Sequence, residues 1–213
     1  MTRNMRGALV AATLLCASAP AAVHAQSRDA APLAAASSDD LTAQDREVLG
    51  WANQLGFEIS QIMDRWIATK AVSEEKLLAR LYFPIPQTDP IKYTSAYDSL
   101  ADRDFSGPQE RMLNRSGVLV YVVVTDINGY LPTHNQRFSQ PLTGQLAVDL
   151  VNNRTKRIFG DRTGFAAARS EAPYLVQRYK RDTGEVMVDL SVPIMVRGKH
   201  FGCVRFGYRR DEH

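Results

Sequence analysis

The chain has 213 residues, of which 45% are hydrophobic and 23% are charged, and its formal net charge is +3 at pH 7. This composition is typical of a folded globular protein and excludes a chain that is disordered along its whole length. The small net charge gives no support to a nucleic-acid-binding protein, so we expect no nucleic-acid partner.

The first 25 residues differ in character from the rest of the chain. Arg3 and Arg6 precede a short apolar run over 8–19, and small residues end the segment at Ala25. This order is typical of a secretory signal peptide, and the run is shorter than the ~20 residues that cross a bilayer. We therefore predict export to the periplasm. The predicted parts are a signal peptide over 1–25, a flexible leader over 26–38, one domain over 39–208 and a C-terminal tail over 209–213.

A helical pattern follows the leader. Apolar residues recur from Val48 to Trp66 at alternating steps of four and three residues, which places them on one face of a helix. A single helix over about 40–71 would be about 45 Å long at about 1.5 Å per residue. We predict that this helix lies across a sheet, and its length also suits pairing with a second copy of the chain.

Shorter elements are predicted from local patterns in the middle of the chain. A short helix begins at Ser73 and ends near Leu81, and another covers 107–114. The segment 82–93 contains three prolines and is predicted not to be regular structure inside a sheet. Two further helical pieces are expected near 147–152 and 164–169.

The strands are predicted from β-branched and aromatic runs bounded by turn residues. Asn128-Gly129 is a strong signal for a hairpin turn after the first of them. The fold class is therefore α+β, with one antiparallel sheet of roughly five strands on which the long N-terminal helix packs. The predicted strands are Val118–Thr125, Tyr130–His134, Tyr174–Arg181, Glu185–Val196 and His200–Tyr208.

Three-residue loops would fix the register of the last three strands. Tyr179 would then lie opposite Met187, and Ser191 opposite Arg205. One face of the sheet would be apolar and would take the long helix, while the other would be half polar and would lie under an irregular insert over 135–172. A small-molecule pocket is expected beneath the insert. The alternative is a solvated face, on which Asp189 and Arg205 form a surface ion pair of little energetic value.

Signatures of catalysis and of metal binding are missing from the sequence. The histidines do not have the helical spacing of a zinc site, and the residues Asp126–Gly129 are explained better by a turn than by a calcium loop. Export would leave Cys203 as the only cysteine, mid-strand and without a neighbouring base, so we expect a packed thiol and no disulfide. We predict no enzyme, no metal and no cofactor.

Several stretches resemble the extracytoplasmic sensor domain of a group of bacterial methyl-accepting chemotaxis proteins. They are TDINGYLPTHNQRFSQPLTG (125–144), DLVNNRTKRIFGDRTGFAAAR (149–169) and YKRDTGEVMVDLSVPIMVRGKHFGCVRFGY (179–208). The likeness covers about 75–208 and implies a single Cache domain, which has a PAS-like sheet and a long N-terminal helix. No transmembrane helix or signalling hairpin accompanies the domain, so the chain resembles a free-standing, exported copy. Phe201 stands where the family has tryptophan, and the Arg-x-Trp-Tyr motif of amino-acid sensors is absent.

The leading prediction is a ligand-sensing module that binds a small polar metabolite between the sheet and the insert. Arg154, Lys156 or Arg157 could pair with a carboxylate or phosphate, because guanidinium groups suit such anions. Each candidate also has a structural reading, as a satisfied corner, a solvated helix end or a core side chain. The candidate ligand-binding residues are Tyr130, His134, Asn135, Arg157, Tyr179, Asp189 and Arg205.

The second prediction is an interaction protein without a ligand. The helix over 40–71 would form a homodimer or would dock a membrane-bound sensor or chemoreceptor, and the sheet would be its scaffold. An enzyme is the least favoured class, because no set of nucleophile, base and orienting group can be assembled from the sequence.

Overall fold

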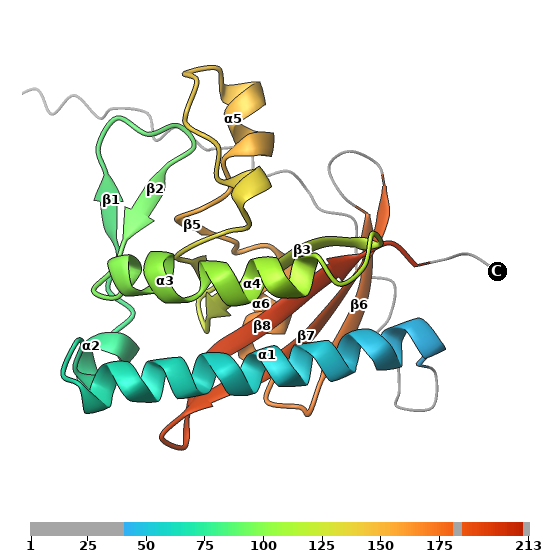
Figure 1. The fold of residues 1–213 in the computed structure, drawn as a ribbon. Helices are drawn as coiled ribbons and strands as arrows, with labels where there is room; N and C mark the ends of the chain where they lie inside the picture. The colour runs from blue at the N-terminus through green and yellow to red at the C-terminus, as the bar shows by residue number, and fades with distance from the viewer. Residues whose placement is uncertain (1–40, 181–184, 211–213) are drawn as a thin grey trace, which may run out of the picture.

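The computed structural model describes residues 41–180 and 185–210. The predicted signal peptide and leader lie outside the described residues, as do the end of the tail and the turn at 182–184. The described chain is an α+β fold built on a four-stranded antiparallel sheet (Figure 1). The strand order is β3 (Leu119–Asp126), β8 (Lys199–Tyr208), β7 (Val186–Val196) and β6 (Leu175–Lys180).

Helix α1 (Ala43–Ala68) crosses one face of this sheet and packs on β7 and β8 (Figure 1). It begins in a capping box, in which Thr42 Oγ1 accepts from the Asp45 amide at 3.1 Å and the Asp45 carboxylate accepts from the Thr42 amide at 2.9 Å. Gly56 lets the helix approach the sheet closely, since a Cβ there would lie 3.3 Å from Val192 Cγ2. The core fills the space between this helix and the apolar sheet face.

The predicted pairs of the last three strands are confirmed, although β7 and β8 reach them through a register shift between Ile194 and Met195 and a two-residue turn in place of the predicted three-residue loop. Tyr179 pairs with Met187 across β6 and β7, and Ser191 pairs with Arg205 across β7 and β8. Because side chains alternate along a strand, this register separates an apolar face from a mixed face. The apolar side chains are buried against α1, except that Val186 at the end of β7 is 45% exposed.

The predicted fifth strand of the sheet is wrong. Residues Tyr130–Leu131 form β4, which pairs with β5 (Arg157–Ile158) in a separate two-stranded sheet. Side chains occupy the edge of β3 where a returning strand would bond. Asn135 Oδ1 accepts from the Val122 amide at 2.8 Å, and Arg137 donates to the carbonyls of Leu119 and Val120.

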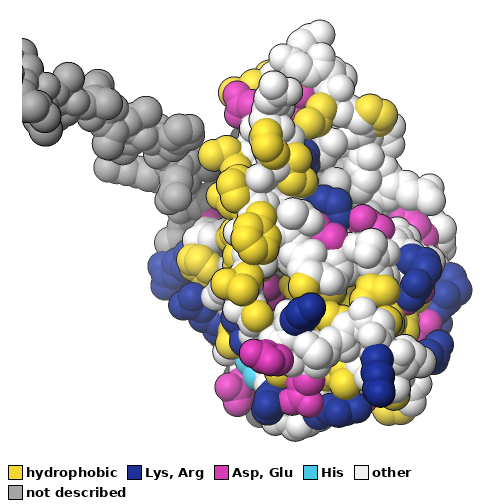
Figure 2. Space-filling model, turned by 90° about the vertical axis from the view of Figure 1, so that its left-hand side faces the viewer, with side chains coloured by type: hydrophobic (Ala, Val, Ile, Leu, Met, Phe, Trp, Pro, Cys, Tyr) yellow, Lys and Arg dark blue, Asp and Glu magenta, His cyan; other side chains and the backbone are white. Residues whose placement is uncertain are grey.

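The segment 82–93 is more regular than its prolines suggest. It contains β1 (Phe83–Ile85) and β2 (Lys92–Thr94), which pair with each other outside the main sheet. Pro84 fits this ribbon because it lies on β1, which pairs with β2 alone and is therefore an edge strand. The side of the molecule that carries this ribbon shows a band of apolar side chains (Figure 2), and the residues Leu81, Phe83 and Ile91 are more than half exposed.

Helices α4 and α6 add to the two faces of the sheet. Helix α4 contacts α1 and β3, and α6 packs on β6, β7 and β8 from the other side. The prediction missed α3, which continues almost directly into α4. The bounds are α2 Glu74–Leu78, α3 Asp98–Asp104, α4 Ser106–Leu113, the 3-10 helix η2 Gln136–Phe138, α5 Leu146–Asn152 and α6 Arg162–Arg169.

Candidate functional site

A buried ion pair lies at the centre of the mixed sheet face. Arg205 on β8 donates through Nη2 and Nε to Asp189 Oδ2 on β7, at 2.7 and 3.0 Å. The Asp189 side chain is 0% exposed and that of Arg205 is 8% exposed, so this is not the surface pair that the sequence allowed. Burial opposes the charge on Arg205, but the Asp189 carboxylate outweighs it and holds the pKa of Arg205 well above its usual value.

Tyr121 on β3 is a third member of this buried group. The sequence analysis did not predict it as a site residue. Its hydroxyl donates to the Asp189 carboxylate and lies 3.2 Å from the hydroxyl of Tyr179 on β6. The ring passes over Gly207, where a Cβ would overlap it. The signal was available in the sequence, because a glycine within a strand of bulky residues often marks a close approach by another group.

His134 lies beside Tyr121, in the loop that follows β4. Its ring is 5% exposed and packs edge-on against the rings of Tyr121 and Phe138, with centroids 6.3 and 4.9 Å away. His134 Nδ1 accepts from the Asn135 amide at 2.7 Å, so Nε2 carries the proton of a neutral ring. Burial lowers the pKa of His134 well below its usual value, and four arginines lower it further: Arg154, Arg137, Arg205 and Arg157.

Three of these four guanidinium groups lie over the ring of a phenylalanine. The Cζ atoms of Arg154 and Arg157 lie 5.3 and 5.2 Å from the Phe159 ring centroid, and Arg137 lies 5.2 Å from that of Phe138. Such stacking orients a guanidinium plane. The arginine–histidine cluster is defined as His134, Arg137, Arg154, Arg157 and Arg205. Arg205 in this cluster is paired with Asp189, and the other three arginines are side chains of a kind that suits an anion.

The side chains of two predicted site residues make their hydrogen bonds outside this cluster. The Tyr130 hydroxyl donates to Asp98 Oδ1 at 2.7 Å and to the Tyr93 carbonyl at 3.0 Å. Besides accepting from the β3 edge, the Asn135 side chain donates to Glu110 Oε1 at 3.1 Å. Both residues therefore hold elements together, whereas His134, Arg157, Tyr179, Asp189 and Arg205 lie in or next to the cluster.

Replacing Asn135 with alanine is expected to lower the free energy of unfolding by about 1–3 kcal/mol, because the buried Val122 amide would lose its acceptor. Urea denaturation measures this change. Asn152→Ala, at an exposed position on α5, is the matched control and should change the free energy by less than about 0.5 kcal/mol. Equal effects of the two substitutions would contradict the structural role of Asn135.

The turn between β3 and β4 is held by a second buried network. Asp126 Oδ1 accepts from the amides of Asn128 and Tyr130 at 2.9 and 3.0 Å, and Oδ2 accepts from the hydroxyls of Tyr82 and Tyr97. Burial raises the pKa of Asp126, although these hydrogen bonds oppose the rise. The Asp-x-Asn-Gly turn is thus a structural corner, and it directs the following residues toward the insert.

Cys203 has the properties of a packed thiol. It is fully buried, its Sγ lies 3.4 Å from Thr125 Oγ1, and burial raises the pKa of the thiol to about 12. It therefore stays protonated at neutral pH, where a nucleophile would need the thiolate. Within the described residues, no group of three or more His, Cys, Asp and Glu side chains is placed to hold a metal ion.

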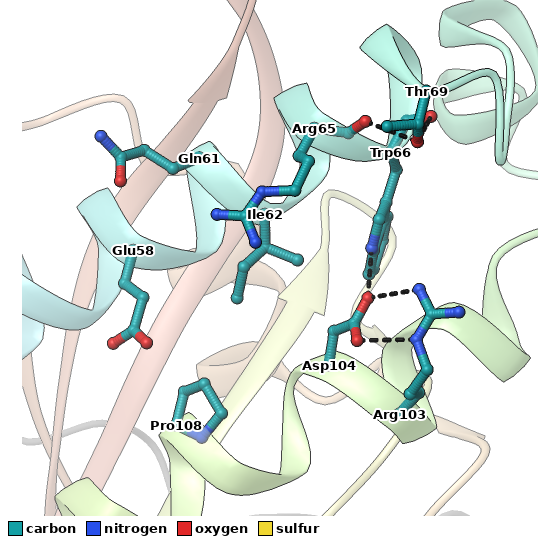
Figure 3. Close-up of a pocket in the computed structure, with 9 residues that line it drawn as sticks. All are labelled: Glu58, Gln61, Ile62, Arg65, Trp66, Thr69, Arg103, Asp104 and Pro108. Carbon is teal, nitrogen blue, oxygen red and sulfur yellow. Dashed lines mark hydrogen bonds and ion pairs between the residues drawn. The ribbon is translucent and has the colours of Figure 1, made fainter.

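A groove of about 660 Å³ lies between α1 and the α3–α4 pair (Figure 3), whereas the sequence predicts a pocket beneath the insert. Trp66 crosses one end of the groove, where its Nε1 donates to Asp104 Oδ2 at 2.6 Å and its ring stacks on Phe105. Asp104 also accepts two hydrogen bonds of 2.7 Å from Arg103. The lining residues are Glu58, Gln61, Ile62, Arg65, Trp66, Thr69, Arg103, Asp104 and Pro108.

Over the residues that the structure describes, no helix combines the length and the apolar character needed to span a bilayer.

Comparisons with known proteins do not test the resemblance to chemoreceptor sensor domains, which stays a prediction. A scan against protein-family models, a search of curated proteins and a search of solved structures each found no match to this chain.

Proposed function

We propose that this domain binds a small organic anion at the arginine–histidine cluster and acts as a ligand-sensing module. The observation that carries the proposal is the group of arginines held on the Phe138 and Phe159 rings, with Phe138 packed against the His134 ring, whose pKa is lowered by burial, by these arginines and by Arg205. We also propose the PAS-like, single Cache architecture that the sequence resemblance implies. The α+β fold, with α1 crossing one face of an antiparallel sheet, supports it.

A carboxylate matches the donors of this cluster. A guanidinium group presents two parallel N–H donors that fit the two oxygens of a carboxylate, and the Nε2–H of a neutral imidazole adds a further donor. The half-buried rings of Phe138 and Phe159 border the cluster and offer apolar contact to a carbon skeleton. Phosphate shares the anionic chemistry, so the test below includes both kinds of anion.

The division of the cluster between two parts of the fold provides a sensing mechanism. Arg137, Arg154 and Arg157 belong to the insert, whereas Arg205 belongs to β8. Asp189 already pairs with Arg205 on the sheet side, and a bound anion would be attracted to the arginines on both sides of this junction. Ligand binding would therefore favour the arrangement in which the insert is held on the sheet.

Export and a membrane-bound partner belong to the same proposal. The residues 1–25 have the order of a signal peptide, which supports a periplasmic location. A periplasmic ligand-sensing domain acts on the cell by contacting a membrane-bound sensor or chemoreceptor, and we propose this as the class of signalling partner.

The melting temperature of the protein, measured with acetate, succinate, citrate, benzoate and inorganic phosphate, tests the proposal. An anion present at 100 times its dissociation constant adds about 2.7 kcal/mol of stability, which raises the melting temperature by a few degrees. Succinamide, a neutral analogue of succinate, should give no shift. A folded protein that responds to none of these anions would overturn the proposal.

Arg157→Ala is expected to weaken binding of the responding anion by about 10- to 100-fold, because a charge-assisted hydrogen bond contributes about 1.5–3 kcal/mol. Isothermal titration calorimetry measures the dissociation constant. Arg162→Ala removes the same charge from an exposed position at the start of α6 and should leave the affinity within about twofold. Equal losses in the two variants would show that general surface charge, and not this cluster, attracts the anion.

A further inference from the structure

The outward face of α1 carries features that the proposed ligand site does not use. Phe57 is 68% exposed, the largest exposed fraction among the large apolar side chains of the described residues. Gln61 and Arg65 follow it at helical spacing and are also exposed. A large exposed aromatic side chain on a helix that borders a groove is typical of an interaction surface.

The four α1 residues at the centre of the groove are arranged symmetrically along the helix. Gln61 and Ile62 lie on either side of the midpoint, and Glu58 and Arg65 lie equally far from it (Figure 3). Glu58 and Arg65 are seven residues apart, which is about 10.5 Å along the helix axis. A two-fold axis through the midpoint would therefore exchange the position of the acid with that of the base.

We propose that α1 docks antiparallel against α1 of a second copy of this chain, with a two-fold axis between Gln61 and Ile62. Each Glu58 then lies beside the partner's Arg65, so the interface contains two equivalent opposite-charge pairs. Phe57 lies the same distance from the axis as Trp66, so each Phe57 faces the end of the partner's groove where Trp66 and Asp104 lie. This inference is independent of the anion site.

The charges select the antiparallel arrangement over the parallel one. In a parallel pair each Glu58 would face the partner's Glu58, and like charges placed together are destabilising. Glu58 is already positioned by Arg111, whose Nη2 donates to both of its carboxylate oxygens at 2.7 and 2.8 Å. A carboxylate has further lone pairs, so Glu58 can accept from the partner's Arg65 without releasing Arg111.

Analytical ultracentrifugation of the full chain tests this interface through charge reversal. The wild type should form dimers at increasing concentration, and Glu58→Arg and Arg65→Glu should each weaken the dimer by about tenfold or more, because attraction becomes repulsion at two places. The double variant should dimerise again. An equimolar mixture of the two single variants should form heterodimers, in which both contacts again join opposite charges.

Two further variants keep the test decisive. Phe57→Glu changes an exposed side chain, so it should preserve the fold while weakening the dimer. Glu47→Arg makes the same charge change on an exposed part of α1 outside the contact and should leave the dimer unchanged. A wild type that stays monomeric at its highest soluble concentration would overturn the proposal. Folded single variants that dimerise as well as the wild type would also overturn it.

Discussion

Arg205→Ala is expected to lower the free energy of unfolding by about 3–5 kcal/mol, which is a large part of the stability of a domain of this size. The loss is large because Asp189 remains buried after its partner is removed. Asp189 is 0% exposed, and without the guanidinium group its carboxylate would be buried with Tyr121 as its remaining side-chain donor. Urea or thermal denaturation followed by circular dichroism measures the loss.

Two further variants distinguish the cost of an unpaired buried carboxylate from the cost of losing the arginine side chain. The double variant Asp189→Leu with Arg205→Met removes both charges and should be less destabilised than Arg205→Ala alone. Arg103→Ala removes an arginine from an exposed pair with Asp104 and should cost less than about 1 kcal/mol. A double variant that is less stable than Arg205→Ala would show that the unpaired carboxylate is not the main cost.

Acidification from pH 6.5 to pH 4.5 is expected to lower the free energy of unfolding by up to about 2 kcal/mol through His134 alone. The pKa of this ring is depressed in the folded protein by burial and by Arg154, Arg137, Arg205 and Arg157. Below about pH 6.5 the unfolded chain takes up a proton at this residue, whereas the folded protein takes it up only at lower pH. Each unit of acidification in this window therefore favours the unfolded state by up to about 1.4 kcal/mol.

The contribution of His134 is isolated by subtraction. Urea denaturation of the wild type and of His134→Gln across the same pH range gives two curves, and the variant should lose less stability on acidification. Other titrating groups act on both proteins and cancel in the difference. Parallel curves would mean that His134 accepts a proton in the folded protein as readily as in the unfolded chain, against the buried cationic environment described above.

The parts of the fold that depend on neighbouring sequence could be predicted well. The last three strands are joined by short connections, so their register follows from alternation of polar and apolar residues, and the pairs Tyr179–Met187 and Ser191–Arg205 are confirmed. The α+β class follows from the same patterns. These features depend on contacts between residues that are close along the chain.

The incorrect parts depend on residues that are distant along the chain. Nothing near Tyr130 indicates that β4 pairs with Arg157–Ile158 instead of β3, because the outcome depends on Asn135 and Arg137 occupying the β3 edge. The ribbon of β1 and β2 is similar. Lys92 anchors it by donating to Asn153 and to the Thr155 carbonyl, and the Tyr93 amide donates to the Lys156 carbonyl at 2.8 Å.

The candidate site was predicted only in part, because it too depends on contacts between residues that are distant along the chain. His134, Arg157, Asp189 and Arg205 come from four separate segments, and the polar sheet face and the insert were enough to group them. Tyr121 was missed because its strand reads as apolar throughout, although alternation places its ring on the mixed face opposite Gly207. Tyr130 and Asn135 were grouped with the site by proximity in sequence, whereas their hydrogen bonds join them to α3, β3 and α4.

The most direct test of anion binding at the cluster is a nuclear magnetic resonance titration of the His134 ring, with and without the anion that raises the melting temperature most. A carboxylate or phosphate bound among these arginines would offset their charge, so the account predicts that the pKa of His134 rises toward its usual value when the anion is bound. A bound anion that leaves the titration of His134 unchanged would place the binding site elsewhere and would contradict the account.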